Sequence, residues 1–505
     1  MSIRRQSIIS SFLVYIGFAI GLLNTYLYAK GFEEVEYGLI GSFMAFGTIM
    51  LAFSNVGITY YIYKFYPYYN DNLPPQKNDM ITIALVTSLS AFAFVMISGF
   101  VFKDFVVRKY AEHSPELIYY YYWLFPFGLG LSVYTILEAY AWQLRKSVLT
   151  NFLKEILWRL FATILIVLMF FGVIRDFDLF IKIYAFTYIG IALVLLVFLV
   201  YKKHLHITFT FSRVTKKFSK KIVRLGLFVW LSSLVLNIST VFDTLVIAAV
   251  VTSGMANVGV YTLAQNISSL VQAPQRAITA ASIPALAQAW KDKDYGRIRL
   301  IYQRSSINQL IFSIAMFLLI WLNFTDGVHT FQLKQGYLDA RIVFFFIGLQ
   351  KIVDMGTGVN SQIIGTSSYW KVELISGIIL VAITLPLNYF LTLQLQEVGP
   401  AIANLFAMIV YNAIRFVFLW RKFNMQPFTI KTLYAILLGV ACYLPCYFLF
   451  SNSQGLVSII VRSGLFILLF GTGVLYLQLS PDVMPVWQTI RKRLRLGGKE
   501  TGSKQ

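Results

Sequence analysis

Charged residues are scarce in this sequence. Only 13% of its 505 residues are Asp, Glu, Lys or Arg, whereas 58% are hydrophobic and the mean hydropathy is +0.69. Ordinary soluble domains carry about twice this share of charge. The composition therefore excludes a water-soluble globular protein and indicates a chain that spans a membrane.

Cysteine and histidine are also rare. The two cysteines, Cys442 and Cys446, lie one helical turn apart in an apolar segment, and the four histidines are scattered along the chain. Such a set supports neither a disulfide framework nor a metal site. We expect both cysteines to be small core residues, and we expect no metal and no cofactor.

Acidic residues are half as frequent as basic ones, 22 against 43, which gives a net charge of +21. A nucleic-acid partner would explain this charge, but no zinc-finger spacing, basic heptad array or aromatic RNA-binding signature accompanies it. Lys and Arg kept in cytoplasmic loops orient a membrane protein and give the same high charge. We therefore expect the bilayer, and no nucleic acid, as the partner.

Apolar runs of about twenty residues, the length that crosses a bilayer as a helix, recur along the whole chain. They predict an all-α, polytopic membrane protein with about 14 transmembrane helices. The predicted spans are 8–28, 38–62, 81–102, 117–141, 152–172, 181–200, 225–251, 258–283, 305–322, 342–363, 372–391, 401–419, 433–450 and 457–479.

The distribution of Lys and Arg predicts the orientation. With the N-terminus inside, the most basic loops, such as 202–224 and the tail 483–505, all fall on the cytoplasmic side. The first apolar run has no small-residue cleavage site, so we expect a spanning helix there and no signal peptide. Both termini are then cytoplasmic.

No loop is long enough for a separate extramembrane domain. The longest external stretches, 103–116 and 323–341, are short, whereas membrane glycosyltransferases and polymerases place their chemistry on large external loops. The sequence therefore predicts a protein that is not an enzyme.

The chain also contains a weak internal repeat. Residues 5–50 and 224–270 both run from a basic start through an apolar helix and a short Gly- and Tyr-containing turn into a second helix. This pattern predicts two pseudo-symmetric six-helix lobes, at 1–215 and 216–425, with a terminal helix pair at 426–482 and a basic cytoplasmic tail at 483–505. Two such lobes facing a central cavity are typical of transporters.

Charges inside predicted spans are the candidate site residues, because each should face a wet cavity or a partner. In the first lobe, Arg159 lies four residues after Glu155, so the two share a helix face and can pair. Lys154 points away from Glu155 and either reaches the surface or contacts substrate. Glu138 in the fourth span has the same two interpretations.

In the second lobe, Lys351 and Asp354 lie in mid-span, three residues apart. A structural salt bridge and a substrate contact are both open for this pair. Asp243 in the seventh span either fixes helix packing or serves a coupling ion or the substrate cavity. Arg276 and Arg415 lie in the inner half of the membrane. When they are counted, the predicted spans contain more cationic than acidic candidate residues. Such a cavity suits an anion such as a diphosphate.

Three segments resemble one known family. They are the outer turn 33–39, the run 243–264 with Val-Gly-Val-Tyr-Thr-Leu-Ala at its end, and Gly-Pro-Ala-Ile-Ala-Asn at 399–404 before a helix with a basic end. They resemble the polysaccharide flippases of the multidrug/oligosaccharidyl-lipid/polysaccharide transporter superfamily, with the Wzx-type O-antigen flippases as the nearest relatives. The resemblance spans nearly the whole chain.

The resemblance implies alternating access in the bacterial inner membrane and transport of undecaprenyl-diphosphate-linked oligosaccharide for surface polysaccharide and lipopolysaccharide synthesis. It implies that Arg159, Lys351 and Arg415 hold the substrate and that Asp243 is the coupling acid for H⁺ or Na⁺. From their places in the predicted spans, Arg276 and Lys154 are further candidate substrate contacts, and Asp354 and Glu138 are further candidate coupling or cavity acids. Polysaccharide polymerase and glycosyltransferases are the implied partners.

Two other functions remain open. A cation-coupled multidrug antiporter of the same superfamily fits the same layout, although the first span has no acid or proline of the kind expected there. A membrane glycosyltransferase or polymerase is the third possibility, and it lacks a loop for its site.

Overall fold

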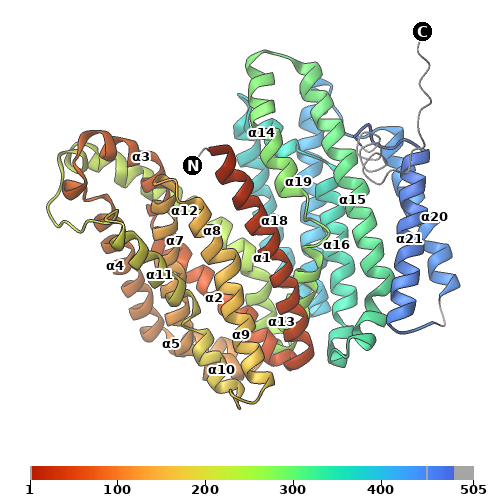
Figure 1. Cartoon of the computed structure of the whole chain (residues 1–505), viewed down its shortest axis with the longest axis horizontal. Helices are drawn as coiled ribbons and strands as arrows, with labels where there is room; N and C mark the ends of the chain where they lie inside the picture. The colour runs from red at the N-terminus through yellow and green to blue at the C-terminus, as the bar shows by residue number, and fades with distance from the viewer. Residues whose placement is uncertain (1–2, 451–452, 483–505) are drawn as a thin grey trace, which may run out of the picture. The chain divides into compact units, whose positions relative to one another are not determined.

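The computed structural model describes residues 3–450 and 453–482, and every regular element in these ranges is a helix. The predicted all-α fold is confirmed (Figure 1). The predicted basic tail lies outside the described residues.

The helices of the first half run from residue 3 to residue 250. Their bounds are α1 (Ile3–Gly31), α2 (Glu34–Asn55), α3 (Ile58–Asn72), η1 (Pro75–Lys77), α4 (Met80–Val101), α5 (Lys103–Tyr110), α6 (Pro115–Tyr119), η2 (Tyr121–Trp123), α7 (Leu124–Gln143), α8 (Ser147–Asn151), η3 (Phe152–Leu157), α9 (Trp158–Phe170), α10 (Phe177–Tyr184), α11 (Thr187–Tyr201) and α12 (Arg213–Val250). The segment η3 is a π-helix, in which the turn is wider than in an α-helix.

The helices of the second half follow from residue 254. Their bounds are α13 (Gly254–Ser268), α14 (Gln275–Lys291), α15 (Tyr295–Thr330), η4 (Gln335–Leu338), α16 (Ala340–Gly356), α17 (Asn360–Gly365), α18 (Trp370–Leu395), α19 (Val398–Phe423), α20 (Ile430–Leu449) and α21 (Leu456–Tyr476).

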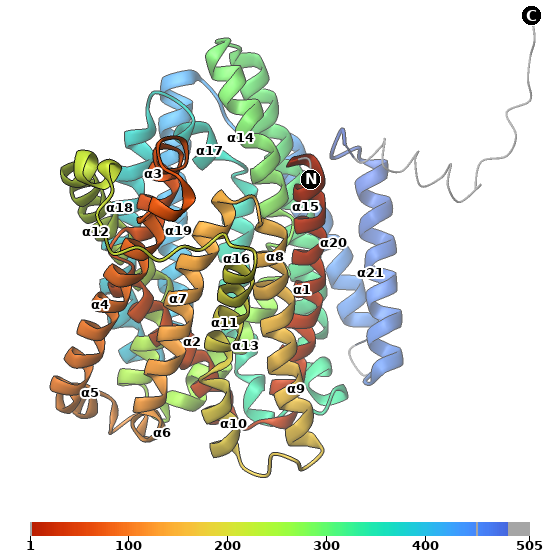
Figure 2. The same ribbon diagram turned by 60° about the vertical axis from the view of Figure 1, so that its left-hand side comes forward.

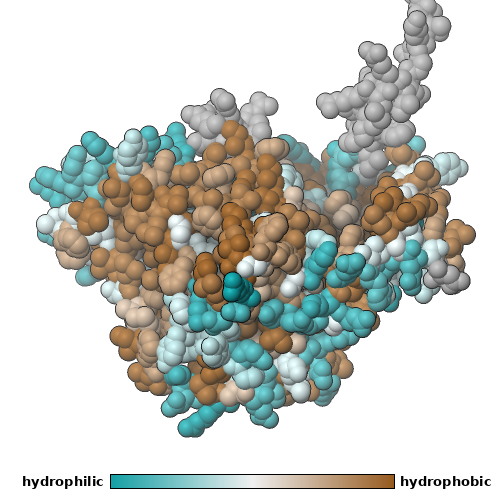
Figure 3. Space-filling view, turned by 60° about the horizontal axis from the view of Figure 1, so that its bottom comes forward, coloured by the Kyte–Doolittle hydropathy of each residue, from teal (hydrophilic) through white to brown (hydrophobic). Residues whose placement is uncertain are grey.

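Eleven helices of the described chain are long and apolar enough to cross a membrane. Helices are the expected form there, because lipid offers no partner for backbone N–H and C=O groups and a helix pairs them internally. Large apolar side chains stay exposed on the outward faces, including Phe94 and Val197 at 71% and 65%. Figure 3 shows broad hydrophobic areas on one such face.

The other three predicted spans are not single α-helices, and span 181–200, counted above, is also divided, between α10 and α11. Span 152–172 consists of η3 followed by α9, span 258–283 breaks between α13 and α14, and span 342–363 breaks between α16 and α17. The eleven candidate membrane helices and these three segments together account for every predicted span.

The second predicted span is shorter than expected. It was predicted to reach residue 62, but α2 ends at Asn55, and Val56 and Gly57 take positive φ angles of 44° and 73°. A left-handed backbone ends an α-helix, so residues 58–62 belong to a separate helix, α3.

The chain divides into two units. Unit 1 comprises Met1–Leu263 with Asn388–Pro400, and unit 2 comprises Ala264–Leu387 with Ala401–Gln505. In unit 1, α7 packs against α2 and α11, and α12 packs against α2 and α3. In unit 2, α15 contacts α16, α20 and α21, and α20 lies beside α21 (Figure 2). The four segments predicted from the sequence remain predictions.

The terminal helix pair is held to α15 by an apolar cluster that contains Cys442, Cys446 and Phe466. Both cysteines are buried and free. Their predicted role as small core residues is confirmed.

Within unit 1, α2 and α13 approach each other backbone to backbone. A Cβ atom added at Gly38 would overlap the carbonyl oxygen of Met255, and one added at Gly259 would overlap that of Glu34. Small residues permit this spacing between membrane helices. Both positions therefore require glycine.

We expect Gly38→Ala to destabilise the protein by about 1–3 kcal/mol, the usual cost of overpacking a closely packed site. Thermal unfolding of the purified protein in detergent measures the effect. Gly471→Ala is the matched control, because nothing lies within 4 Å of a Cβ atom at that position. Equal stability of the two variants would contradict the assignment of the close contact.

Candidate functional site

The three interrupted spans carry most of the predicted site residues. Lys154 lies in the π-helix η3, Arg276 lies at the start of α14, and Lys351 and Asp354 lie in the last turns of α16. Non-helical backbone at membrane depth is tolerated where it is buried in protein or lines a cavity. Broken helices therefore place these charges where a polar ligand can be bound.

In unit 1, Glu138, Lys154 and Arg159 come together with Glu155. The Lys154 Nζ atom lies 3.7 Å from Glu138 Oε2 of α7, and the Arg159 Nη2 atom lies 3.0 Å from Glu155 Oε2. The pair predicted between Glu155 and Arg159 is thus confirmed. Two cations face two carboxylates in this cluster, so its charges balance.

This cluster is also tied to α1. The Arg159 guanidinium donates to the carbonyl of Gly17. The Asn24 side chain donates to the Arg159 carbonyl at 2.9 Å and accepts from the Thr163 hydroxyl at 2.6 Å. These hydrogen bonds fix the helix on which Arg159 lies, while the Lys154 side chain stays 45% exposed.

Asp243 of α12 forms a second polar cluster in unit 1. It is 5% exposed, and one carboxylate oxygen accepts a hydrogen bond of 2.6 Å from the Tyr261 hydroxyl. The Asn388 side-chain amide donates to the other oxygen, and the Thr392 hydroxyl donates to the backbone carbonyl of Asn388 at 2.6 Å. Three segments distant in sequence thus surround one buried carboxylate.

In unit 2, Asp354 is the centre of an amide and hydroxyl network. Its Oδ2 atom accepts from Gln275 Nε2 at 2.7 Å, and its Oδ1 atom lies 3.5 Å from Asn412 Nδ2. The Asn412 Oδ1 atom accepts from Thr357 and Asn360, each at 2.8 Å. The network joins the ends of α14, α16 and α17 to α19, at two of the three interruptions.

Arg415 lies one turn beyond Asn412 on α19 and is 2% exposed. Its guanidinium forms an ion pair with Glu373 of α18 and lies 3.5 Å from the centre of the Tyr411 ring. Ser361 donates to the same Glu373 carboxylate at 2.8 Å. The cation predicted to hold substrate therefore has a carboxylate partner within the protein.

The predicted residues thus fall into three groups. Glu138, Lys154 and Arg159 form one cluster, and Asp243 lies in another. In unit 2, the hydrogen bonds of Asp354 bring the start of α14, where Arg276 is exposed, close to the part of α19 that carries Arg415. Lys351 lies half-buried one turn before Asp354.

Sequence reasoning missed the partners of these charges. Glu373, Asn412, Gln275, Asn388 and Tyr261 all lie in or beside apolar segments. A search for amides and acids in every predicted span, in addition to mid-span charges, would have found the first four. Among the described residues, no group of three or more His, Cys, Asp and Glu could hold a metal ion.

Comparison with known proteins gives a family and a fold. A family model described as "Polysaccharide biosynthesis protein" matches residues 3–290. No curated protein sequence matches the chain.

Several solved structures match most of the chain, including the following two. A structure titled "Lipid II flippase MurJ, inward closed conformation" matches with a TM-score of 0.72 and 15% identity, over 94% of this chain and 100% of that one. An inward-facing multidrug resistance MATE family transporter of the MOP superfamily matches with a TM-score of 0.61 and 18% identity, over 79% and 93% of the two chains. The fold predicted from the sequence is confirmed by both.

Proposed function

The chain belongs to the polysaccharide biosynthesis protein family, and we propose on this basis that it is a flippase for lipid-linked oligosaccharides. It carries undecaprenyl-diphosphate-linked repeat units across the bacterial inner membrane by alternating access, without catalysing a reaction. Both termini lie in the cytoplasm in this proposal. The observation that supports it most is the placement of paired charges at interrupted membrane helices.

The paired charges suggest how a diphosphate is held. Arg159 and Arg415 each have a carboxylate partner, Glu155 and Glu373, and Lys154 lies near Glu138. Phosphate oxygens bind guanidinium groups with the same fork geometry as carboxylates. Within each unit, a substrate diphosphate can therefore take the place of a carboxylate at the cation. In unit 2, Lys351 and Arg276 add positive charge.

The displaced carboxylates explain a need for a coupling ion. A carboxylate left without its cation inside a membrane protein is strongly unfavourable. Uptake of H⁺ or Na⁺ by the displaced carboxylate, which is Glu138 where Lys154 binds the substrate, offsets this cost. Asp243 and Asp354 are the other two carboxylates that we propose for the coupling ion. Substrate binding and ion binding are then linked through charge balance.

Deletion of the gene in its host tests the function. Surface polysaccharide, including any O-antigen, is expected to disappear, while lipid-linked repeat units accumulate on the cytoplasmic side. In this proposal, glycosyltransferases assemble the repeat units before this step and a polymerase joins them after it. Unchanged surface polysaccharide in the deletion strain would contradict the proposal.

A cation-coupled multidrug antiporter is the second candidate. The fold shared with a MATE transporter and the buried carboxylate of Asp243 favour it. This function predicts that expression lowers drug accumulation in cells and leaves surface polysaccharide unchanged, so the deletion strain also separates the two candidates.

Single substitutions test the charged clusters. We expect Arg159→Ala and Lys351→Ala to reduce transport by roughly tenfold or more, because charge-assisted hydrogen bonds contribute on the order of 1.5–3 kcal/mol. The measurement is flipping of a lipid-linked oligosaccharide in proteoliposomes, normalised to the amount of inserted protein.

Lys182→Ala is the matched control for Arg159→Ala. Lys182 forms an ion pair of the same spacing with Asp178, at 2.6 Å, near the end of α10, and its loss should leave transport unchanged. If the Arg159 and Lys351 variants are instead inserted poorly and transport normally per molecule, both residues are structural.

A further inference from the structure

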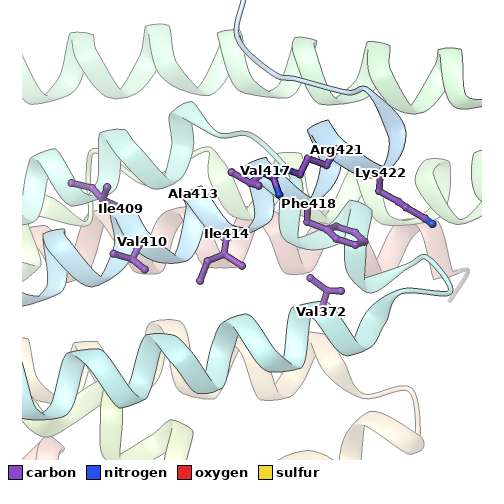
Figure 4. A pocket seen from close by; sticks show the side chains of 9 residues that line it. All are labelled: Val372, Ile409, Val410, Ala413, Ile414, Val417, Phe418, Arg421 and Lys422. Atoms are coloured by element: carbon purple, nitrogen blue, oxygen red, sulfur yellow. The ribbon is translucent and has the colours of Figure 1, made fainter.

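Helices α18 and α19 of unit 2 line an open groove of about 720 Å³ (Figure 4). Val372 comes from α18, and a run of apolar side chains from Ile409 to Phe418 comes from α19. Arg421 and Lys422, at the end of α19, are the basic residues of the lining. The wall is therefore hydrocarbon along its length and positive at one end.

The two basic side chains are accessible to a ligand. Arg421 and Lys422 are exposed, and neither forms an ion pair with a carboxylate of the described chain. The Lys422 ammonium lies 5.4 Å from the centre of the Tyr369 ring, a contact that leaves its N–H groups available. A ligand that complements the groove has a long apolar chain and an anionic head.

The length of the groove limits the kind of chain. Lys422 follows Ile409 by 13 residues, which is about 20 Å along an α-helix. The hydrocarbon core of a bilayer is about 30 Å thick, so the groove is somewhat longer than the depth of one leaflet. An acyl chain fits this depth, whereas a polyprenyl chain long enough to cross the bilayer extends beyond it.

We propose that this groove binds an anionic glycerophospholipid. An acyl chain lies along the apolar face of α19, and the phosphate contacts Arg421 and Lys422. On the proposed orientation, the basic end faces the cytoplasm, where anionic lipids attract such residues. The site is independent of the transported substrate, because it depends only on the groove and its two cations.

Native mass spectrometry of the purified full-length protein tests the site. Wild-type protein should retain phosphatidylglycerol and bind phosphatidylcholine with the same acyl chains several-fold more weakly. The double variant Arg421→Gln/Lys422→Gln should bind phosphatidylglycerol about tenfold more weakly. The control Lys291→Gln/Lys293→Gln removes the same charge from exposed positions outside the groove and should bind as the wild type does.

A second pair of variants tests the apolar wall. Ala413→Trp fills the groove at an exposed position of α19 and should reduce phosphatidylglycerol retention by a similar factor. Ala441→Trp, at an exposed position of α20, should leave it unchanged. Size-exclusion chromatography and thermal unfolding establish that each variant is folded.

Three outcomes overturn the proposal. Equal binding of the two phospholipids would exclude recognition of charge. Unaltered binding in both groove variants would place the lipid elsewhere. Displacement of phosphatidylglycerol by a lower concentration of a polyprenyl phosphate would assign the groove to a transported lipid, and normal surface polysaccharide in the deletion strain would separately contradict the flippase function.

Discussion

Replacing Arg462 with alanine is expected to destabilise unit 2 by about 3–5 kcal/mol, because it leaves a buried carboxylate without its cation. Arg462 of α21 donates to Asp326 of α15 at 3.0 Å, and both side chains are 8% exposed. The Arg462 Nε atom also donates to Asn323 at 2.9 Å. Unfolding in detergent, followed by susceptibility of α20 and α21 to protease, measures the loss.

Two variants sharpen this prediction. Arg304→Ala is the control, because Arg304 lies on α15, the helix that carries Asp326, and pairs with Asp482 at 3.8 Å, where both side chains are about half exposed. A pair of this kind contributes about 0–1 kcal/mol. The double variant Arg462→Met/Asp326→Leu should recover most of the lost stability, since it removes both charges. If Arg462→Ala is as stable as Arg304→Ala, the buried pair does not hold the terminal helices.

The second large effect is expected at Asp243. Asp243→Asn should reduce ion-driven transport roughly ten- to hundredfold, because contacts with a charged group contribute on the order of 1.5–3 kcal/mol. The fold should persist, since the Tyr261 hydroxyl, which donates to Asp243 at 2.6 Å, can donate to the new amide oxygen. The Asn388 amide, which now donates to the other Asp243 oxygen, can turn over and accept from the new amide NH2 group. Transport in proteoliposomes under an imposed H⁺ or Na⁺ gradient measures the effect.

Asp178→Asn is the control for Asp243→Asn. Asp178 pairs with Lys182 at 2.6 Å, and its side chain is 39% exposed, so its charge is dispensable for ion coupling. Equal transport by the two variants, together with lower stability of Asp243→Asn, would assign Asp243 to helix packing alone.

Hydropathy predicted where the chain crosses the membrane, because the apolar runs are long and the polar loops are short. It did not predict where helices are interrupted. The break at 357–359 contains Gly358, with φ of 64°, and Pro274 precedes α14, so both breaks have a local signal. The π-helix at 152–157 has none that we can identify, because a wider turn changes neither composition nor apolar periodicity.

The candidate site was predicted only in part. A charge in an apolar run is visible in one segment of sequence, so Arg159, Asp243 and Asp354 could be selected. Their partners depend on tertiary packing. Asn388 lies 145 residues from Asp243, and Asn412 lies 58 residues from Asp354, and no periodicity within a segment relates such positions. A single sequence therefore indicated the charges and not what surrounds them.

The contact between Gly38 and Gly259 has a consequence for how this chain can evolve. Because the backbones of α2 and α13 touch directly, the spacing of these helices does not depend on matched side-chain shapes. Positions of α2 and α13 outside this contact can therefore change one at a time without altering the spacing of the two helices. Gly38 and Gly259 have no such freedom. Each is already the smallest residue, so a larger residue at one of them cannot be compensated by a smaller residue at the other.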